Sequence, residues 1–319
     1  MDHLAVPATS NVRRFSSPAT ILAWLAVPCL IALPFLGLSE YAIGIFTLGL
    51  FFAVYAMGWD LLFGYAGEPN FGATFLIGVG AYTAAMLNSN GLASPWICVI
   101  AGSLMSVIAG VLLALPALRL RGPYFGLVTL VAVLILRQLI ILFSHQTGGE
   151  IGIAVPDVLT LSAVANYEIA LACAIVSAVM IITVARSPFG LILQAIGQDP
   201  LNAQAMGFSI VKYKLAAFCY SAFFSGLAGA LMTFYMGTAS LNVFVDASVG
   251  VQIIIAAIIG GRRTIIGPAI GGVFLIVLGE YMRPFGRLSE LVVAVIALLV
   301  LLFLPNGLLG LLKLKRSAR

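Results

Sequence analysis

Charged side chains surrounded by apolar sequence are the first residues in this chain that could do chemistry. Glu68 follows Gly-Tyr-Ala-Gly at 64–67, and Arg137 stands inside an apolar run that continues to Phe143. Ionisable groups in such surroundings are costly, so each is a candidate functional group. For Glu68, a path-lining residue at a bend and a solvated carboxylate are equal alternatives. For Arg137, we expect an ion pair or a side chain that reaches a polar boundary, and contact with a solute is the alternative.

Residue patterns typical of catalysis and cofactor binding are absent from the sequence. It contains no Gly-x-Ser-x-Gly motif, no histidine cluster and no close pair of aspartates. The phosphate-binding pattern GxxxxGK[ST] is also missing. Cys29, Cys98, Cys173 and Cys219 lack the spacing of a metal or redox site, and His145 has no neighbouring ligands. The sequence therefore predicts no catalytic residue, no metal site and no cofactor bound by this chain.

The composition indicates a membrane protein. Of the 319 residues, 62% are hydrophobic and 8% are charged, whereas a soluble domain has about 25% charged residues. The net charge is +5, but the basic residues lie in short clusters between apolar runs rather than along one face. We therefore expect a lipid bilayer as the surroundings and no nucleic-acid partner.

Apolar runs predict an all-α, polytopic bundle of about ten membrane segments. We expect a cytoplasmic tail at 1–19, a transmembrane domain at 20–305 and a basic cytoplasmic tail at 306–319. Two of the ten runs are too short to cross the bilayer easily and are expected to be half-helices or a re-entrant pair. The runs are Ile21–Leu36, Ile43–Phe63, Phe71–Leu87, Ala93–Ala117, Tyr124–Phe143, Ala165–Ala185, Leu215–Met236, the short Val249–Ile259 and Ile265–Gly279, and Leu288–Leu304.

The distribution of positive charge predicts the orientation of the chain. With the N-terminus in the cytoplasm, thirteen of the 16 Lys and Arg residues fall on the cytoplasmic side, as the positive-inside rule requires. Arg283 and Arg287 fall on the outer side. Both termini are therefore expected to be cytoplasmic.

The longest polar connection between the predicted spans, residues 186–214, should hold a short surface helix. Asp199 can cap that helix and Pro200 can occupy its first position. Leu201, Ala205 and Phe208 are spaced to form an apolar stripe. We expect a partner protein to dock on this helix from the cytoplasm.

Nine short motifs together resemble the branched-chain amino-acid permease family of ABC importers, LivM type, over about residues 58–312. The match in the inner loop is Ala-Gln-Ala-Met-Gly at 203–207, which is similar to the ATPase coupling loop of that family. The other motifs are Gly-Tyr-Ala-Gly at 64–67, Gly-Val-Gly-Ala-Tyr-Thr-Ala at 78–84, Leu-Arg-Leu-Arg-Gly-Pro-Tyr-Phe-Gly at 118–126, Thr-Gly-Gly at 147–149, Ser-Pro-Phe-Gly at 187–190, Ser-Gly-Leu-Ala-Gly-Ala at 225–230, Ile-Gly-Gly-Arg-Arg-Thr-Ile-Ile-Gly-Pro at 259–268 and Pro-Asn-Gly-Leu at 305–308.

The resemblance implies a permease that forms half of a solute path and has no enzymatic activity of its own. It implies a second permease subunit of the LivH type, two ABC ATPase subunits that bind ATP and Mg²⁺, and a periplasmic or extracellular solute-binding protein. The family often carries arginines near Leu191 and Gly197, where this chain has none, so apolar contact with the ATPase is expected instead. The residues expected to couple to the ATPase are Ser187, Phe189, Gly190, Asp199, Leu201, Ala203, Ala205, Met206 and Gly207.

Two further groups of residues are candidates for contact with the solute and with the outer partner. The predicted path residues are Gly67, Glu68, Asn70, Phe71, Gly78, Tyr82, Arg137, Gly261 and Gly267. The predicted outer contact is Gly148, Gly149 and Glu150, for which a simple tight turn is an equal alternative. Branched-chain or related amino acids are the leading solutes, while urea, small amides or an ion-coupled secondary transporter remain alternatives.

Overall fold

The computed structural model describes residues 28, 30–118, 124–286, 292, 295, 298, 299 and 307. The chain divides into two compact units, Met1–Leu38 and Ser39–Arg319. In the first unit, Leu33–Leu36 form the short 3-10 helix η1. The second unit is called the helical unit here, and it contains the remaining helices and strands of the described residues.

Long apolar helices build the helical unit, and short elements connect them. Seven helical stretches in the described residues are long and apolar enough to cross a membrane, and α3 is a shorter apolar helix. The long helices are α2 (Glu40–Asp60), α3 (Ala73–Ser89), α4 (Pro95–Ala117), α5 (Tyr124–Leu142), α7 (Ala163–Arg186), α10 (Ile210–Met236), α12 (Ala247–Gly260) and α13 (Ile266–Met282). The short elements are η2 (Leu61–Tyr65), α6 (Ser144–Thr147), β1 (Ile153–Ala154), α8 (Pro188–Gln198), α9 (Pro200–Ala205), β2 (Thr238–Ala239), α11 (Leu241–Phe244) and η3 (Arg283–Phe285).

Each of the eight predicted apolar runs that lie in the described residues is a helix. Most of the last run, 288–304, and half of the first, 21–36, lie outside the described residues, so the count of ten remains a prediction. The two runs predicted to be short are longer than expected, because α12 starts at Ala247 and α13 continues to Met282. Helix α12 still rises only about 21 Å over its 14 residues. A break at Val245 and Asp246 separates it from α11.

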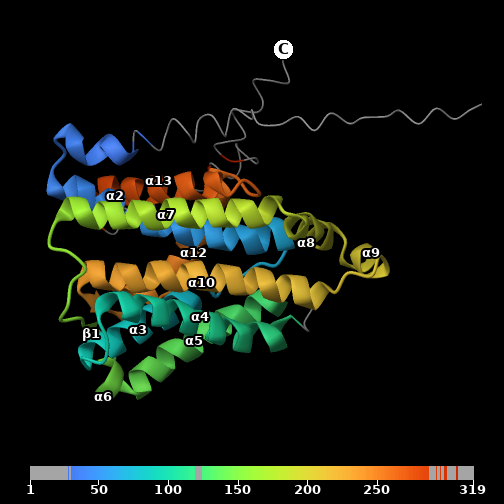
Figure 1. Cartoon of the computed structure of the whole chain (residues 1–319), viewed down its shortest axis with the longest axis horizontal. Helices are drawn as coiled ribbons and strands as arrows, with labels where there is room; N and C mark the ends of the chain where they lie inside the picture. The colour runs from blue at the N-terminus through green and yellow to red at the C-terminus, as the bar shows by residue number, and fades with distance from the viewer. Residues whose placement is uncertain are drawn as a thin grey trace, which may run out of the picture. The chain divides into compact units, whose positions relative to one another are not determined.

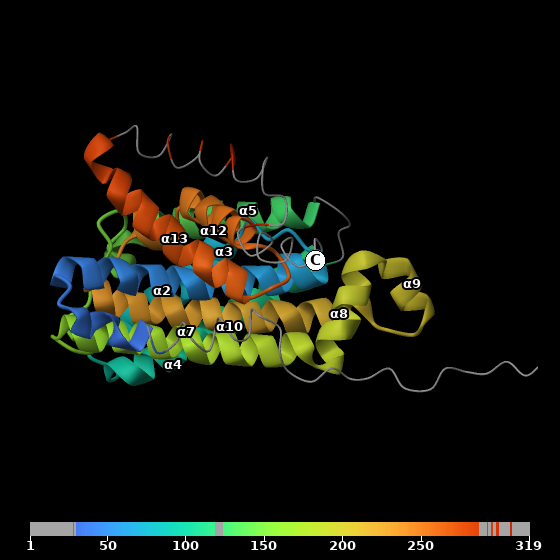
Figure 2. The same cartoon turned by 90° about the horizontal axis from the view of Figure 1, so that it is seen from above.

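Helices α2 and α10 form the centre of the bundle, being the most buried of the span-length helices. Helix α2 packs against α7, α10, α12 and α13, and α10 packs against α3 and α4. Figures 1 and 2 show the long helices lying side by side, with α8 and α9 projecting from one end.

Small residues let these helices approach closely, as is usual inside membranes. A Cβ added at Gly80 of α3 would lie 2.6 Å from the Cα of Gly226 of α10. One polar group also joins three helices, because the Ser106 hydroxyl of α4 lies 2.8 Å from the carbonyl oxygen of Leu76 and 3.0 Å from that of Ala222. The glycines near 226 are therefore packing residues.

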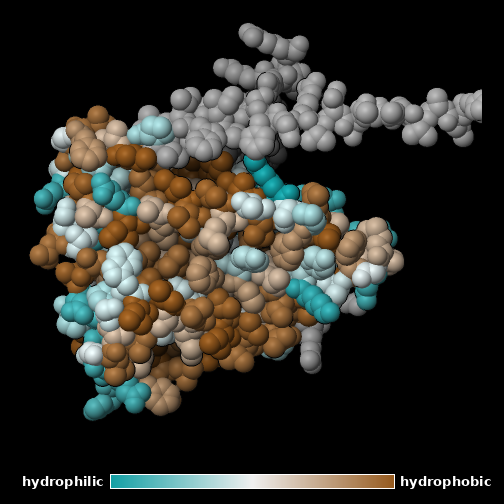
Figure 3. Space-filling view, viewed as in Figure 1, coloured by the Kyte–Doolittle hydropathy of each residue, from teal (hydrophilic) through white to brown (hydrophobic). Residues whose placement is uncertain are grey.

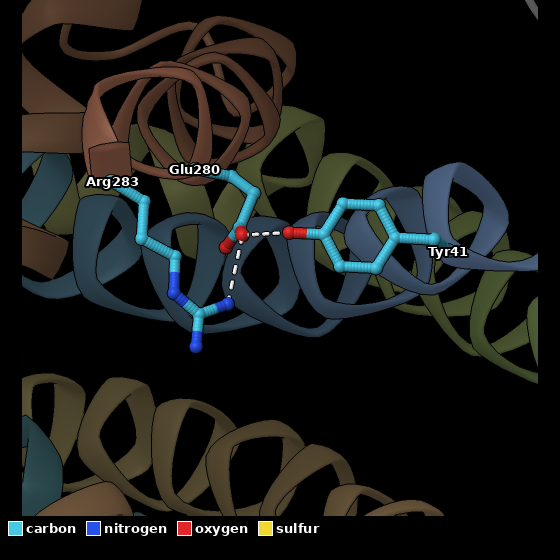
Figure 4. A network of polar contacts seen from close by, with 3 residues as sticks. All are labelled: Tyr41, Glu280 and Arg283. Atoms are coloured by element: carbon cyan, nitrogen blue, oxygen red, sulfur yellow. Dashed lines mark hydrogen bonds and ion pairs between the residues drawn. The ribbon is translucent and has the colours of Figure 1, made fainter.

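The end of the helical unit away from α8 and α9 is closed by short polar contacts. Strands β1 and β2 pair antiparallel, with Ile153 opposite Ala239. In Figure 4 the Tyr41 hydroxyl of α2 donates to Glu280 of α13, and Arg283 Nη1 donates to the same carboxylate at 2.9 Å. These contacts hold the start of α2 to the end of α13.

The surface between the two ends is apolar. Figure 3 shows hydrophobic residues along the middle of one face, with hydrophilic residues gathered toward its ends. Large exposed hydrophobic side chains occur along α4, α5 and α7, for example Leu112, Leu127 and Val179. A surface of this kind is suited to lipid or to another membrane subunit, and it is unsuited to water.

Candidate functional site

The first part of the candidate site is the elbow, defined as residues 188–208 between α7 and α10, which comprise α8, α9 and the turn after α9. Helix α8 begins with Pro188, directly after Ser187. Proline is common at the first position of a helix, but the sequence pattern did not lead us to predict a helix here. Gly190 is buried against the end of α7, where an added Cβ would lie 2.1 Å from the carbonyl oxygen of Ala185. Only a residue without a side chain fits there, so Gly190 permits the sharp angle between the two helices.

The predicted surface helix is confirmed as α9. The Asp199 carboxylate accepts hydrogen bonds at 3.0 Å from the backbone N–H groups of Leu201 and Asn202, and Pro200 is the first residue. This is the cap that the Asp-Pro pair predicts. Gly207 follows α9 with a φ of +91°.

The elbow has an exposed apolar surface and a buried one. Leu191, Leu201 and Met206 are exposed by 63%, 69% and 64%, although all three are large and apolar. Ala205 is also exposed. Ala203, in contrast, is buried together with Leu193 and Ile196 of α8. Ala203 therefore faces the protein, and the exposed side chains are the ones that a partner could reach.

Aromatic rings fix the elbow to the first turns of α10. The Phe189 ring stacks on Tyr213 with a centroid separation of 5.4 Å, and the Phe208 ring meets the edge of the same tyrosine at 6.2 Å. Phe208, predicted as part of the exposed stripe, is therefore half-buried against α10. These rings make the elbow and the start of α10 one packed unit.

The second part of the site is the irregular end of α2. After Asp60 the helix widens into the π-helix η2 and then leaves the helical path at residues 66–72. The returning chain is tied back to α2, because the Trp59 indole N–H donates to the Asn70 carbonyl at 2.7 Å. π-helical turns occur frequently at functional sites.

Asp60 joins this end of α2 to the connection between α12 and α13. Its buried carboxylate accepts a hydrogen bond at 2.9 Å from the Arg263 N–H and one at 3.2 Å from the Ile265 N–H. Arg263 Nε donates back to the Gly64 carbonyl at 2.7 Å. The guanidinium of Arg262 lies 5.2 Å from the Phe63 ring centroid.

The connection held by Asp60 is strained. Arg263 and Ile265 have φ values of 61° and 59°, which non-glycine residues rarely adopt. The Ile266 N–H also donates to the Thr264 carbonyl at 2.7 Å, so Ile265 is the centre of a γ-turn of the rare strained form. Such conformations cost on the order of 1–3 kcal/mol each and persist only when their surroundings hold them. The Asp60 carboxylate is the group that holds this turn.

Two contacts join the irregular end of α2 to the elbow and to the start of α10. Gly67, with a φ of +72°, lies so close to α8 that an added Cβ would be 3.0 Å from the Gly197 carbonyl oxygen. Glu68 forms an ion pair with Lys214 of α10, and their side chains are only 14% and 11% exposed. We use the name junction for three segments that contact one another: residues 60–68, residues 261–265 and Lys214. It connects the elbow to the α12–α13 pair.

The structure therefore separates the predicted path residues into groups. Gly67 and Glu68 belong to the junction, where Glu68 pairs with Lys214 and is largely shielded from solvent. Gly261 and Gly267 are packed inside the α12–α13 turn, where an added Cβ at Gly267 would lie 2.4 Å from the Gly260 carbonyl oxygen. The backbone N–H of Phe71 donates to Thr129 Oγ1 at 3.1 Å. These five residues shape the backbone of the bundle.

Gly78 and Arg137 lie at a second place, where α3 and α5 approach the break before α12. A Cβ added at Gly78 would lie 2.6 Å from Val245 and 3.2 Å from Leu136. This close approach brings Arg137 of α5 beside Asp246, and their charged atoms lie 3.8 Å apart. The structure thus shows the predicted pairing of Arg137.

The predicted outer contact is a tight turn. Gly148 and Gly149 have φ values of 69° and 56°, and an added Cβ at Gly148 would lie 2.0 Å from the Gly152 carbonyl oxygen. Glu150 is exposed beside them. The turn explains these glycines, so only Glu150 offers a side chain to a partner there.

Sequence reasoning missed several residues of the junction. Asp60 was not predicted as a site residue, although a lone carboxylate in an apolar run is itself a signal. Gly197 and Lys214 were also missed, because their roles depend on contacts with residues far away in the sequence. Gly197 contacts Gly67, and Lys214 pairs with Glu68, which is 146 positions away. Among the described residues, no group of three or more His, Cys, Asp or Glu side chains could hold a metal ion.

The fold and this site are those of a membrane permease component. Residues 41–304 match the family model described as branched-chain amino acid transport system / permease component, so the chain belongs to this family. It is 30% identical to the high-affinity branched-chain amino acid transport system permease protein LivM of Escherichia coli, over 90% of this chain and 75% of that protein.

Two other relatives show how far the family extends. The chain is 23% identical to the permease protein LivH of Salmonella typhimurium, over 83% of this chain and 92% of that protein. It is 25% identical to the guanosine ABC transporter permease protein NupQ of Bacillus subtilis, over 71% of this chain and 76% of that protein. No solved structure gives a significant match.

Proposed function

We propose that this permease forms half of the solute path of an ABC importer for branched-chain or related amino acids. Two separate ATPase subunits bind ATP and Mg²⁺ and dock on the elbow. A second permease of the LivH type completes the path, and a solute-binding protein delivers the solute from outside. Family membership and the names of the relatives support this assignment.

The exposed apolar surface of the elbow is the observation that carries the proposal. The elbow projects past the ends of the long helices in both views (Figures 1 and 2), so lipid tails do not explain its exposed leucines and methionine. The basic residues Lys212, Lys214, Arg262 and Arg263 lie at or beside the same end, which the positive-inside rule assigns to the cytoplasm. An ATPase would therefore meet the elbow from the cytoplasmic side of the inner membrane.

Alternating access gives the mechanism. Closure of the ATPase pair moves the elbow, and the junction passes this motion to α2, α12 and α13. Motion is passed on efficiently only through closely packed contacts. The backbones of Gly67 and Gly197 are packed closely enough to form such a contact.

The solute assignment rests on similarity alone. NupQ is named as a guanosine transporter, so the family does not fix the solute. Urea or small amides are therefore second candidates. An ion-coupled transporter is disfavoured because the buried Asp60 carboxylate accepts backbone N–H groups, which leaves it a poor cation ligand.

A charge placed on the elbow tests the docking proposal. In cells that express all subunits, we expect Leu201→Asp and Met206→Asp to abolish co-purification of the ATPases and solute uptake, because an apolar interface rejects an unpaired carboxylate. Gln204→Glu is the control, since Gln204 is exposed on the same helix but is not part of the apolar surface. Unchanged ATPase binding in both aspartate variants would refute the docking site.

A further inference from the structure

Arg137 and Asp246 differ from the other ion pairs of the described residues in their position. Arg137 lies five residues before the end of α5, or about 7.5 Å along the helix. Asp246 lies at the break that precedes α12. Their side chains are 41% and 28% exposed, although both belong to stretches long and apolar enough to cross a membrane. The pair is thus partly exposed within stretches whose length and apolar composition suit a membrane, where an unscreened charge is costly.

The pair also has unused hydrogen-bonding capacity. The guanidinium carries five N–H donors, and in the described residues its polar contact is the 3.8 Å approach to Asp246 Oδ2, which is too long for a hydrogen bond. Asp246 Oδ1 accepts the Ser248 N–H at 2.7 Å, which fixes the carboxylate as the cap of α12. The Ser248 side chain also interacts with this carboxylate, and the acceptor positions that Ser248 leaves unused are available to another donor.

Helix α3 packs beside the start of α12 and carries polar groups of its own. Thr74, Gly78 and Tyr82 follow one another at intervals of four residues, which places them along one side of this helix. Gly78 contacts Val245, and Thr74 lies beside Gly250 of α12. The hydroxyls of Thr74 and Tyr82 are buried and have no hydrogen-bond partner in the described residues. Buried hydroxyls normally have partners, so Thr74, which lies one turn along α12 from Asp246, has hydrogen-bonding capacity that the described residues leave unused.

We propose that Arg137 and Asp246 bind the two charged groups of an α-amino acid zwitterion as it enters the path. The guanidinium binds the carboxylate through two parallel hydrogen bonds, which is its preferred geometry. The Asp246 carboxylate binds the ammonium group. The inference rests on the proposed function and assigns the recognition of the amino-acid head group to this chain.

The location agrees with this role. The C-terminal end of α12 adjoins the junction and the elbow, so Asp246 at its other end lies toward the side that the charge distribution predicts to be external. A solute delivered from outside reaches this level first.

Neutral variants of both residues test the assignment in the complete transporter. Membrane vesicles containing all subunits are supplied with saturating binding protein and radiolabelled leucine, and uptake and ATP hydrolysis are measured together. We expect Arg137→Gln, Asp246→Asn and the double variant each to lower the leucine moved per ATP by at least tenfold, with subunit assembly unchanged. Glu280→Gln combined with Arg283→Gln is the control, because that pair lies at the same end of the bundle and has its own partners.

The outcomes separate the possible roles of the pair. A purely structural ion pair predicts that the double variant, which carries no unpaired charge, transports leucine normally, and this result would overturn the proposal. Loss of the second permease from the purified complex would assign the pair to subunit contact and would also overturn it. If wild-type vesicles move only uncharged solutes, the amino-acid part of the proposed function fails together with this assignment. Leucine uptake that survives in all three variants refutes this assignment alone.

Discussion

The junction and the Arg137–Asp246 pair use charged groups inside the same bundle in opposite ways. At the junction, Asp60 accepts two backbone N–H groups, Glu68 pairs with Lys214 and Arg263 donates to Gly64. At the pair, the two charges are partly exposed and are not hydrogen-bonded to each other. A polar group whose bonds are all satisfied fixes structure, whereas one with unused bonds is available to a ligand.

This contrast predicts different costs for removing a charge at the two places. Loss of a junction group leaves buried partners without a hydrogen bond, so protein stability falls. Loss of a charge at the pair leaves little unsatisfied in the empty protein, so stability changes little while transport falls. Measuring both quantities on the same variants separates structural charges from functional ones.

Substitution of Asp60 should have the largest effect on stability. Asp60→Ala leaves the N–H groups of Arg263 and Ile265 buried without acceptors, at a cost of about 1–3 kcal/mol each. The strained turn at Ile265 also loses its support. We expect the melting temperature of the detergent-purified complex to fall by many degrees, with Asp60→Asn intermediate because one oxygen acceptor remains.

Two controls sharpen this measurement. Asp157→Asn makes the same chemical change at the opposite end of the bundle, where Asp157 pairs with Asn88, and it should lower the melting temperature only slightly. Arg137→Gln should leave the melting temperature nearly unchanged. An Asp60→Ala complex that melts like wild type would show that the turn does not depend on this carboxylate.

The Glu68–Lys214 pair should give a smaller effect that can be reversed. Breaking a fully buried ion pair costs about 3–5 kcal/mol, and this pair, which retains some exposure, should lose less. We expect Glu68→Lys and Lys214→Glu to lower uptake per ATP hydrolysed, because the link between the end of α2 and the start of α10, on which the elbow packs, is broken. The double exchange Glu68→Lys with Lys214→Glu should recover most of it. Failure of the double exchange to recover coupling would argue against a direct link.

The sequence predicted the helices well because each is encoded locally. Apolar runs identified the eight long helices of the described residues, and the Asp199-Pro200 pair identified the start of α9. Helix α8 was missed because it is short and mixes polar with apolar residues, although the Ser187-Pro188 start and the buried spacing of Leu193 and Ile196 indicate it.

The junction could not be predicted, because its contacts join distant parts of the chain. Asp60 and Arg263 are 203 positions apart, and no local pattern in either segment specifies the other. Glycine spacing was also ambiguous, since Gly67, Gly78 and Gly267 appear alike in the sequence. In the structure, Gly67 contacts the elbow and Gly78 lies beside Val245. Gly267 is packed where α12 turns into α13.

Ser106 offers the smallest and most local test of how satisfied polar groups act in this bundle. Its hydroxyl bridges α4 to the backbone carbonyls of α3 and α10, and membrane hydrogen bonds of this kind contribute about 0.6 kcal/mol on average and about 1.7 at most. Ser106→Ala should therefore lower the melting temperature by only a degree or two and leave uptake unchanged. Ser103→Ala is the matched control, because Ser103 is equally buried on α4 but bonds only to Val99 of its own helix, at 2.7 Å. Equal melting temperatures for the two variants would mean that close helix packing, rather than the Ser106 bridge, holds α4 against α3 and α10.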